Sequence, residues 1–119
     1  MNSSFIFQKK FSLEKRTSES KKIREKYEDK IPIIVERSKY GTLPKIDKCK
    51  FLVSSEMTLG QFIYVIRRRI KLSESEAIFL FINNNVLPPT STTLKDLYEE
   101  HKNTDGFLYI SYCNENVFG

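Results

Sequence analysis

A chain of 119 residues with 39% hydrophobic and 13% aromatic side chains fits one globular domain and is too apolar for a disordered chain. The longest apolar run, residues 77–82, is far shorter than a membrane-spanning helix, and no signal peptide is evident, so we expect a cytosolic protein. The net charge of +5 is uneven, because residues 1–50 carry 14 Lys and Arg against 7 Asp and Glu. This basic half suggests acidic partners such as peptides, lipid headgroups, tubulin-like surfaces or nucleic acid, although charge alone favours a solvated surface.

A basic helix is predicted early in the chain. Ser12 suits the N-cap, and Glu14 suits the positive end of the helix dipole. Leu13, Ile23 and Tyr27 can share one apolar stripe, while Lys and Arg dominate the remaining surface. The residues before Ser12 fit either a short helix or a mobile arm.

Two strands with a long connection follow this helix. Residues 31–36 are rich in β-branched side chains, and residues 48–53 alternate polar and apolar side chains. Gly41 and Pro44 lie between them and indicate a loop. The two strands are therefore expected to pair as a hairpin.

The helix that comes next has the clearest local signals. Thr58 and Gln61 form a capping box, and Met57 and Phe62 form a hydrophobic staple. Apolar residues continue at helical spacing, and three arginines at 67–69 occupy the last turn. These arginines either complement the helix dipole as surface charge or bind phosphate groups.

The remaining elements are shorter. Residues 77–82 predict a strand buried on both faces, and the three asparagines at 83–85 predict a tight turn. Thr93 is the expected N-cap of a short helix, and Gly106 releases the chain into a last strand at 107–112.

This order of elements predicts an α+β fold. The same order of helices and strands occurs in a ubiquitin-like β-grasp roll, which is a four-stranded mixed sheet with a crossing helix. Here an extra basic N-terminal helical segment precedes the roll. We expect a helical extension packed on the roll (1–28), a ubiquitin-like domain (29–112) and a flexible tail (113–119). The last strand should lie centrally, parallel to the first. The expected core residues come from the strands and the capped helix: Ile33, Val35, Leu52, Phe62, Ile66, Ile70, Phe79, Phe81, Leu94, Leu97, Leu108 and Ile110.

Catalytic and metal-binding patterns are lacking in the sequence. The single histidine, His101, stands among acidic residues at a helix end, where a surface role is expected. Cys49 and Cys113 have no metal-ligand spacing and are expected to be buried thiols. We therefore expect no enzyme, no cofactor and no metal. Binding is better supported, because residues 48–53 would form an edge strand that can accept an extended peptide.

Many blocks of the chain, in order, closely resemble the ubiquitin-like modifiers of autophagy, the GABARAP and microtubule-associated light-chain family. The resemblance covers nearly everything from about Phe11 onward. The matching blocks are LEKR (13–16), KIREKY (22–27), IPIIVE (31–36), DKCKFLV (47–53), GQF (60–62), IRRRI (66–70), FINN (81–84), LPPTS (87–91), LYEEH (97–101), FLYISY (107–112) and FG (118–119).

The resemblance implies that the chain is a substrate of conjugation chemistry. Gly119 matches the glycine that activating and conjugating enzymes hold as a thioester and join to phosphatidylethanolamine on forming autophagosomes. A processing and delipidating cysteine protease is a further implied partner. The protein would then be cytoplasmic, and membrane-attached on autophagosomes or related vesicles after lipidation. From the residues alone, the glycine after a strand and short tail is either such an accessible carboxylate or a frayed end.

The resemblance also implies binding of aromatic-x-x-aliphatic peptide motifs with acidic flanks, as found in cargo receptors and adaptors. The aromatic pocket maps onto Glu19, Ile23, Pro32, Lys50, Leu52 and Phe107. The aliphatic pocket maps onto Phe51, Val53, Met57, Phe62 and Val65. The basic contacts to the peptide map onto Lys30, Lys48 and Arg69.

Family members also use the N-terminal arm to touch membranes or tubulin. Here the arm either does so or packs on its own domain; the residues suited to membrane contact are Phe5, Ile6, Phe7, Lys9 and Lys10. Three departures from the family pattern lie outside the arm. Ser54 stands where the family usually has Pro, Asn85 is an apparent insertion, and Gly106 replaces a commoner larger residue.

Two further readings compete with a lipid-conjugated, monomeric modifier. One is an unconjugated peptide-binding or microtubule-associated adaptor with the same fold. The other is a basic nucleic-acid binder, which is not expected because aromatic residues in the pattern of an RNA-binding sheet are lacking.

Overall fold

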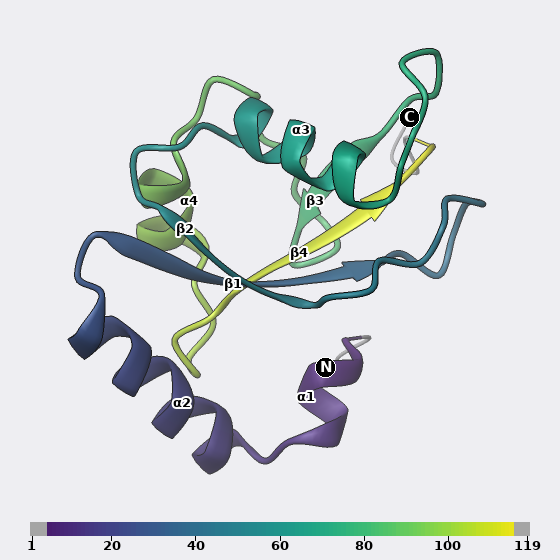
Figure 1. Cartoon of the computed structure of the whole chain (residues 1–119). Helices are drawn as coiled ribbons and strands as arrows, with labels where there is room; N and C mark the ends of the chain where they lie inside the picture. Colours follow the sequence, from purple (N-terminus) through teal and green to yellow (C-terminus); the bar gives the residue numbers. More distant parts are fainter. Residues whose placement is uncertain (1–4, 116–119) are drawn as a thin grey trace.

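The computed structural model describes residues 5–115, and within them helices and strands follow the predicted order (Figure 1). The helical elements are α1 (Ile6–Lys10), α2 (Leu13–Lys26), α3 (Leu59–Arg69) and α4 (Leu94–His101). The strands are β1 (Lys30–Arg37), β2 (Lys50–Ser54), β3 (Phe79–Ile82) and β4 (Leu108–Cys113).

Within the described residues, the strands form one mixed sheet in the order β2-β1-β4-β3. β4 is central and parallel to β1, whereas β2 and β3 run antiparallel to their neighbours. The predicted ubiquitin-like arrangement, with a last strand parallel to the first, is therefore confirmed. β2 lies at one edge of the sheet, as expected.

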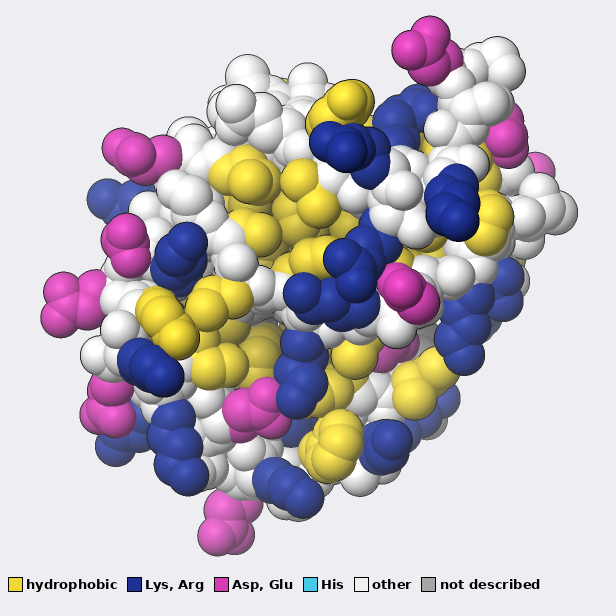
Figure 2. Space-filling view, viewed as in Figure 1, with side chains coloured by type: hydrophobic (Ala, Val, Ile, Leu, Met, Phe, Trp, Pro, Cys, Tyr) yellow, Lys and Arg dark blue, Asp and Glu magenta, His cyan; other side chains and the backbone are white. Residues whose placement is uncertain are grey.

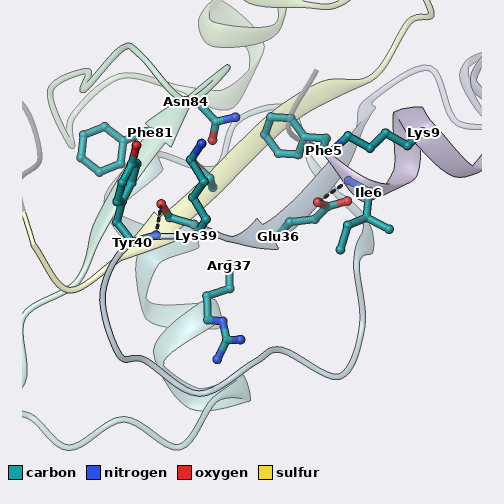
Figure 3. A pocket seen from close by; sticks show the side chains of 11 residues that line it. Phe5, Ile6, Lys9, Glu36, Arg37, Lys39, Tyr40, Phe81 and Asn84 are labelled. Carbon is teal, nitrogen blue, oxygen red and sulfur yellow. Dashed lines mark hydrogen bonds between the residues drawn. The ribbon is translucent and has the colours of Figure 1, made fainter. Parts of the chain in front are cut away.

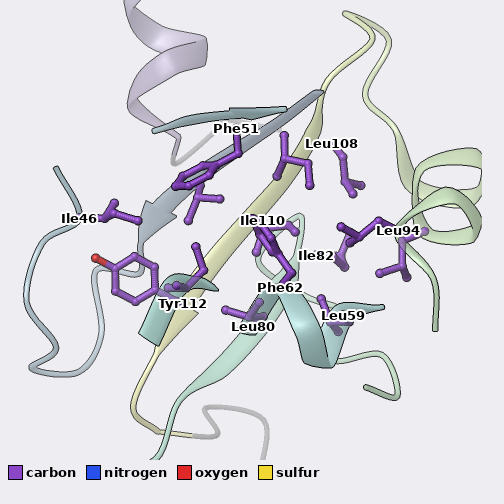
Figure 4. Close-up of a cluster of buried hydrophobic side chains, with 14 of the residues drawn as sticks. Ile46, Phe51, Leu59, Phe62, Leu80, Ile82, Leu94, Leu108, Ile110 and Tyr112 are labelled. Atoms are coloured by element: carbon purple, nitrogen blue, oxygen red, sulfur yellow. The ribbon is translucent and has the colours of Figure 1, made fainter. Parts of the chain in front are cut away.

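The two faces of the sheet carry separate apolar clusters. α3 crosses one face, and Figure 4 shows its Phe62 and Leu59 among side chains from the strands. α1 and α2 lie on the other face (Figure 1). A smaller cluster forms there from Phe5, Phe7, Ile34, Phe107 and Tyr109. The N-terminal arm is thus packed on its own domain by Phe5 and Phe7.

The predicted helix starts are confirmed. The side chains of Ser12 and Thr93 accept hydrogen bonds from backbone N–H groups three residues later. Thr58 accepts from the Gln61 N–H, and the Gln61 side chain accepts from the Thr58 N–H, which completes the capping box. Each cap satisfies donors that a helix end would otherwise leave unpaired.

The turn residues also behave as expected. Asn83 and Asn84 have φ of 54° and 65°, a left-handed conformation that asparagine tolerates. Gly106 has φ of +90°, and a side chain at this position would collide with Ser20. Glycine is therefore required where the chain turns into β4.

Several expectations for buried side chains are wrong. Leu52 is 37% exposed, because it faces away from α3 on the alternating edge strand. Phe79 is half-buried. Phe81 is buried as expected, but it does not belong to the cluster beneath α3. The third strand begins at Phe79, two residues later than expected, and Ala77 is exposed. Cys113 is buried, whereas Cys49 is half-buried.

The expected apolar stripe of α2 is also wrong. Leu13 is 52% exposed and Tyr27 is exposed, so Ile23 alone of the three is half-buried. The buried residue of this helix is Ser20. α2 is therefore held to the domain chiefly by polar contacts.

The tyrosines divide into a buried and an exposed group. Burial raises the pKa of Tyr98 and Tyr112, and burial with a hydrogen bond to Asp105 raises the pKa of Tyr109 most. The exposed tyrosines are Tyr27, Tyr40 and Tyr64.

These shifts predict a loss of stability at alkaline pH. The folded state favours the neutral phenols of these three buried tyrosines. Their contribution to the free energy of unfolding is therefore complete below the unfolded pKa of about 10 and is lost as pH rises above it. In a spectrophotometric titration, Tyr98, Tyr109 and Tyr112 should ionise only together with unfolding. Ionisation of these three tyrosines in the folded protein would contradict this expectation.

Candidate functional site

Among residues 5–115, no strand pairs with the outer edge of β2, so its backbone groups are open there. The Val35 N–H donates to the Cys49 carbonyl over 2.8 Å, so this pair is hydrogen-bonded across β1 and β2. In an antiparallel ladder such pairs alternate with non-bonded ones. The backbone groups of Lys50 and Leu52 therefore point away from β1. Pro32, which has no N–H, stands opposite Leu52, where no ladder bond is needed.

One apolar surface lies between β2 and α2. Leu52 is exposed there, and its neighbour Pro32 is buried. The Lys50 Nζ lies 2.7 Å from Glu19 Oε2 and joins the two elements across this surface. Both groups are partly exposed, so the pair contributes little stability and can open for a ligand.

Two other residues of the predicted aromatic pocket, Ile23 and Phe107, lie deeper than Leu52 and Lys50. Ile23 is half-buried against the cluster that contains Phe107. Phe107 is fully buried, with the Phe7 ring centroid 5.3 Å from its own. The structure therefore places Phe107 beneath the surface, and it places Phe7 beside it, a neighbour that sequence reasoning did not identify.

A second apolar surface lies between β2 and α3. The Phe51 ring packs edge-on against Phe62, with centroids 5.7 Å apart. Val53, Met57 and Val65 are half-buried against the same core, while Phe62 is fully buried below them. Figure 2 shows hydrophobic side chains gathered on this face between α3 and α2, with Lys and Arg side chains among them.

The three predicted basic residues lie at both ends of β2. Lys48 Nζ is 4.9 Å from the Phe51 ring centroid, and the Arg69 guanidinium is 6.0 Å from it. Arg69 Nε also donates to Asp47 Oδ1 over 3.1 Å. Lys30 pairs with Ser54 at the opposite end. An acidic peptide on this edge would meet positive charge at both ends.

Sequence reasoning did not identify the polar cluster that anchors α2. Asp105 is fully buried and forms an ion pair with Arg16. Its Oδ1 accepts from the Phe107 N–H over 2.9 Å, and its Oδ2 accepts from the Tyr109 hydroxyl over 2.6 Å. The Ser20 hydroxyl donates to the Asp105 backbone carbonyl. This cluster fixes the helix that carries Glu19 and Ile23 relative to the strand that carries Phe107.

The N-terminal arm is fixed by another carboxylate. Glu36 accepts from the Ile6 N–H over 2.8 Å and from the Phe7 N–H over 2.9 Å. Phe5 and Phe7 are buried, so they are unavailable for the membrane contact considered from sequence. Ile6, which is 59% exposed, remains on the surface with Lys10.

Other candidate groups are absent or outside the described region. Among residues 5–115, no group of three or more His, Cys, Asp or Glu side chains could hold a metal ion. No helix in this part of the chain is long and apolar enough to cross a membrane. Gly119 lies outside the described residues.

Comparisons with known proteins agree with this architecture. A family profile described as "Autophagy protein Atg8 ubiquitin like" matches residues 15–119. The chain is 56% identical to Autophagy-related protein 8 of Schizosaccharomyces pombe and 54% identical to Autophagy-related protein 8d of Arabidopsis thaliana. Each alignment spans 113 residues and covers 95% of this chain and 93% of the relative.

A solved structure shows the same fold. The crystal structure of Trypanosoma brucei ATG8 superposes with a TM-score of 0.89 at 37% identity, covering 98% of this chain and 100% of that chain. The chain is thus a ubiquitin-like autophagy protein, and it belongs to the Atg8 family.

Proposed function

We propose that this protein is conjugated through Gly119 to phosphatidylethanolamine and acts on autophagosome membranes as an adaptor for aromatic-x-x-aliphatic peptides. The open outer edge of β2, between two apolar surfaces, carries the peptide-binding part of this proposal. Family membership supports the conjugation. The partners would be the activating and conjugating enzymes, a delipidating cysteine protease, and cargo receptors or adaptors.

The peptide would bind as an added strand. The outward backbone groups of Lys50 and Leu52 can pair with it, and alternate side chains can then enter the two apolar surfaces. Leu52, Ile23 and Glu19 would receive the aromatic side chain. The surface formed by Phe51, Val53, Met57, Phe62 and Val65 would receive the aliphatic one.

Lipid attachment would give the adaptor a firm membrane anchor. A single acyl chain holds a protein only marginally, whereas phosphatidylethanolamine supplies two chains. In this role the chain is the substrate of the conjugating enzymes. The protein would move between the cytoplasm and autophagosomes or related vesicles as the lipid is added and removed.

Mass spectrometry of the membrane-bound protein tests the conjugation. We expect a phosphatidylethanolamine adduct on Gly119 and its loss in Gly119→Ala, because a side chain at this position obstructs a cleft shaped for glycine. Gly60→Ala is a control glycine substitution within α3, and it should keep the adduct. A membrane-bound protein without the adduct would refute conjugation.

The second candidate is an unconjugated peptide-binding or microtubule-associated adaptor. It is favoured by one observation: the β2 edge and its two surfaces are complete within the described residues and do not need the tail. This candidate predicts that Gly119→Ala leaves localisation unchanged. Loss of vesicle localisation in Gly119→Ala would exclude it.

A further inference from the structure

Lys50 of the candidate peptide site has a second contact, on the N-terminal arm. Its Nζ lies 5.8 Å from the Phe7 ring centroid, in addition to its contact of 2.7 Å with Glu19 Oε2. The ammonium group is therefore placed between α2 and the arm. Lys50 and Leu52 extend to the same side of β2, because alternate residues of a strand face the same way. The Lys50 side chain thus borders the surface that Leu52 exposes.

The Phe7 ring is fixed by its packing. It lies edge-on to Phe107, with centroids 5.3 Å apart, and tilted against Phe11 at 5.1 Å. Only 4% of Phe7 is exposed. A ring packed in this way keeps one orientation, so the protein determines how it faces Lys50.

The backbone of Phe7 is fixed by Glu36. The two carboxylate oxygens of Glu36 accept from the N–H groups of Ile6 and Phe7, and Figure 3 shows this carboxylate directed at the start of α1. α1 has five residues, and Phe5 at its N-cap supplies no side-chain hydrogen bond. Glu36 therefore replaces the missing cap of a helix that is too short to be stable alone.

We propose that Phe7 is a positioning residue for the peptide site: its ring holds the Lys50 ammonium beside the aromatic pocket, so that the docked arm raises the affinity for aromatic-x-x-aliphatic peptides. This inference rests on the proposed peptide-binding function. The exposed pair of Lys50 and Glu19 opens easily, whereas a cation and a ring attract each other without a hydrogen bond. When a peptide side chain separates Lys50 from Glu19, the Phe7 ring keeps the lysine at the edge of the pocket.

Isothermal titration calorimetry with a synthetic acidic aromatic-x-x-aliphatic peptide tests this role. Phe7→Leu should weaken binding about two- to fivefold, the loss that corresponds to a cation–π contact at an exposed site. Phe5→Leu is the matched control, because it removes a buried ring of the same arm that packs against Tyr109. It should bind like the wild type. Glu36→Gln loosens the arm and changes no ring, and it should weaken binding in the same direction as Phe7→Leu.

A double-mutant cycle shows whether Phe7 acts through Lys50. In a Lys50→Ala background, Phe7→Leu should have no further effect on peptide affinity. Two results would overturn the proposal. One is equal weakening by Phe7→Leu and Phe5→Leu, which would indicate a general loss of arm packing. The other is an undiminished effect of Phe7→Leu in the Lys50→Ala background, which would indicate that Phe7 acts through Phe107.

Proton NMR of the free protein separates this role from the proposed function. The ε-methylene signals of Lys50 should shift in Phe7→Leu, because the ring current of Phe7 is lost, and should stay in place in Phe5→Leu. If the wild type binds the peptide but these signals do not move in Phe7→Leu, the positioning role fails and the peptide site stands. A wild type that binds no such peptide refutes the proposed peptide site, and with it this role of Phe7.

Discussion

Replacing Asp105 with alanine should lower the free energy of unfolding by about 3–5 kcal/mol, as expected when one partner of a buried ion pair is removed. The carboxylate is fully buried and contacts Arg16, Tyr109 and the Phe107 N–H. Its loss leaves the Tyr109 hydroxyl and the Phe107 N–H without this acceptor and removes the counterion of Arg16, whose Nε still donates to the Phe11 carbonyl. Urea-induced unfolding followed by circular dichroism measures the difference.

The exposed pair of Asp47 and Arg69 provides a matched control. Asp47→Ala also removes a carboxylate from an arginine, but both side chains of this pair are largely solvated. The expected loss is at most about 1 kcal/mol. Equal losses in the two variants would show that Asp105 acts as an ordinary surface charge and would contradict the prediction.

The Asp105 cluster also links the fold to the candidate site. α2 has few buried apolar side chains, so the contacts of Arg16 and Ser20 with Asp105 replace a conventional apolar interface. Glu19 lies beside Ser20 on the same helix and pairs with Lys50 of β2. Asp105→Ala should therefore accelerate hydrogen exchange of backbone amides more in α2 than in α3. The reason is that α3 packs in the apolar cluster on the opposite face of the sheet.

The features that could be predicted from the sequence are encoded by neighbouring residues. Thr58 and Gln61 are three positions apart, and they define the start of α3 by direct hydrogen bonds. The turn at Asn83 and the bend at Gly106 follow from the conformational freedom of those residues. Helix and strand order then restricts the fold to few topologies, which is why the β-grasp arrangement was predictable.

The features that could not be predicted depend on residues far apart in the chain. Arg16 and Asp105 are separated by 89 positions, and nothing local marks either as the partner of the other. Leu13 and Tyr27 have the spacing of an apolar stripe, but α2 turns both toward solvent because its buried contacts are polar. Periodicity predicts a helix face, whereas the partner element decides whether that face is covered.

The same distinction applies to the peptide site. Alternation along β2 predicted that Lys50 and Leu52 share one side while Phe51 and Val53 share the other. It could not show which residues are accessible, since that depends on the surrounding helices. Leu52 is exposed, whereas the pocket residues Phe62 and Phe107, named from the family resemblance, are fully buried. We therefore infer that the buried Phe62 and Phe107 support the two apolar surfaces from the interior of the domain and that exposed residues such as Leu52 contact the peptide.

This inference leads to a strong expected effect on binding. Lys50→Ala combined with Leu52→Ala should weaken an acidic aromatic-x-x-aliphatic peptide by about 30-fold or more, the loss that about 2 kcal/mol at a binding hot spot produces. The substitutions remove the side chains beside the outward backbone groups and release Glu19. Isothermal titration calorimetry with a synthetic peptide measures the change.

A second double variant separates this site from general effects of charge and apolar surface. Lys95→Ala with Leu87→Ala also removes one lysine and one exposed leucine, but both lie outside the β2 edge. It should bind the peptide like the wild type. Because Lys50 and Leu52 are both exposed, neither double variant should change the unfolding midpoint substantially. Equal weakening in the two variants would show that the peptide is held by the net charge of the protein, and the β2 edge would then not be the recognition site.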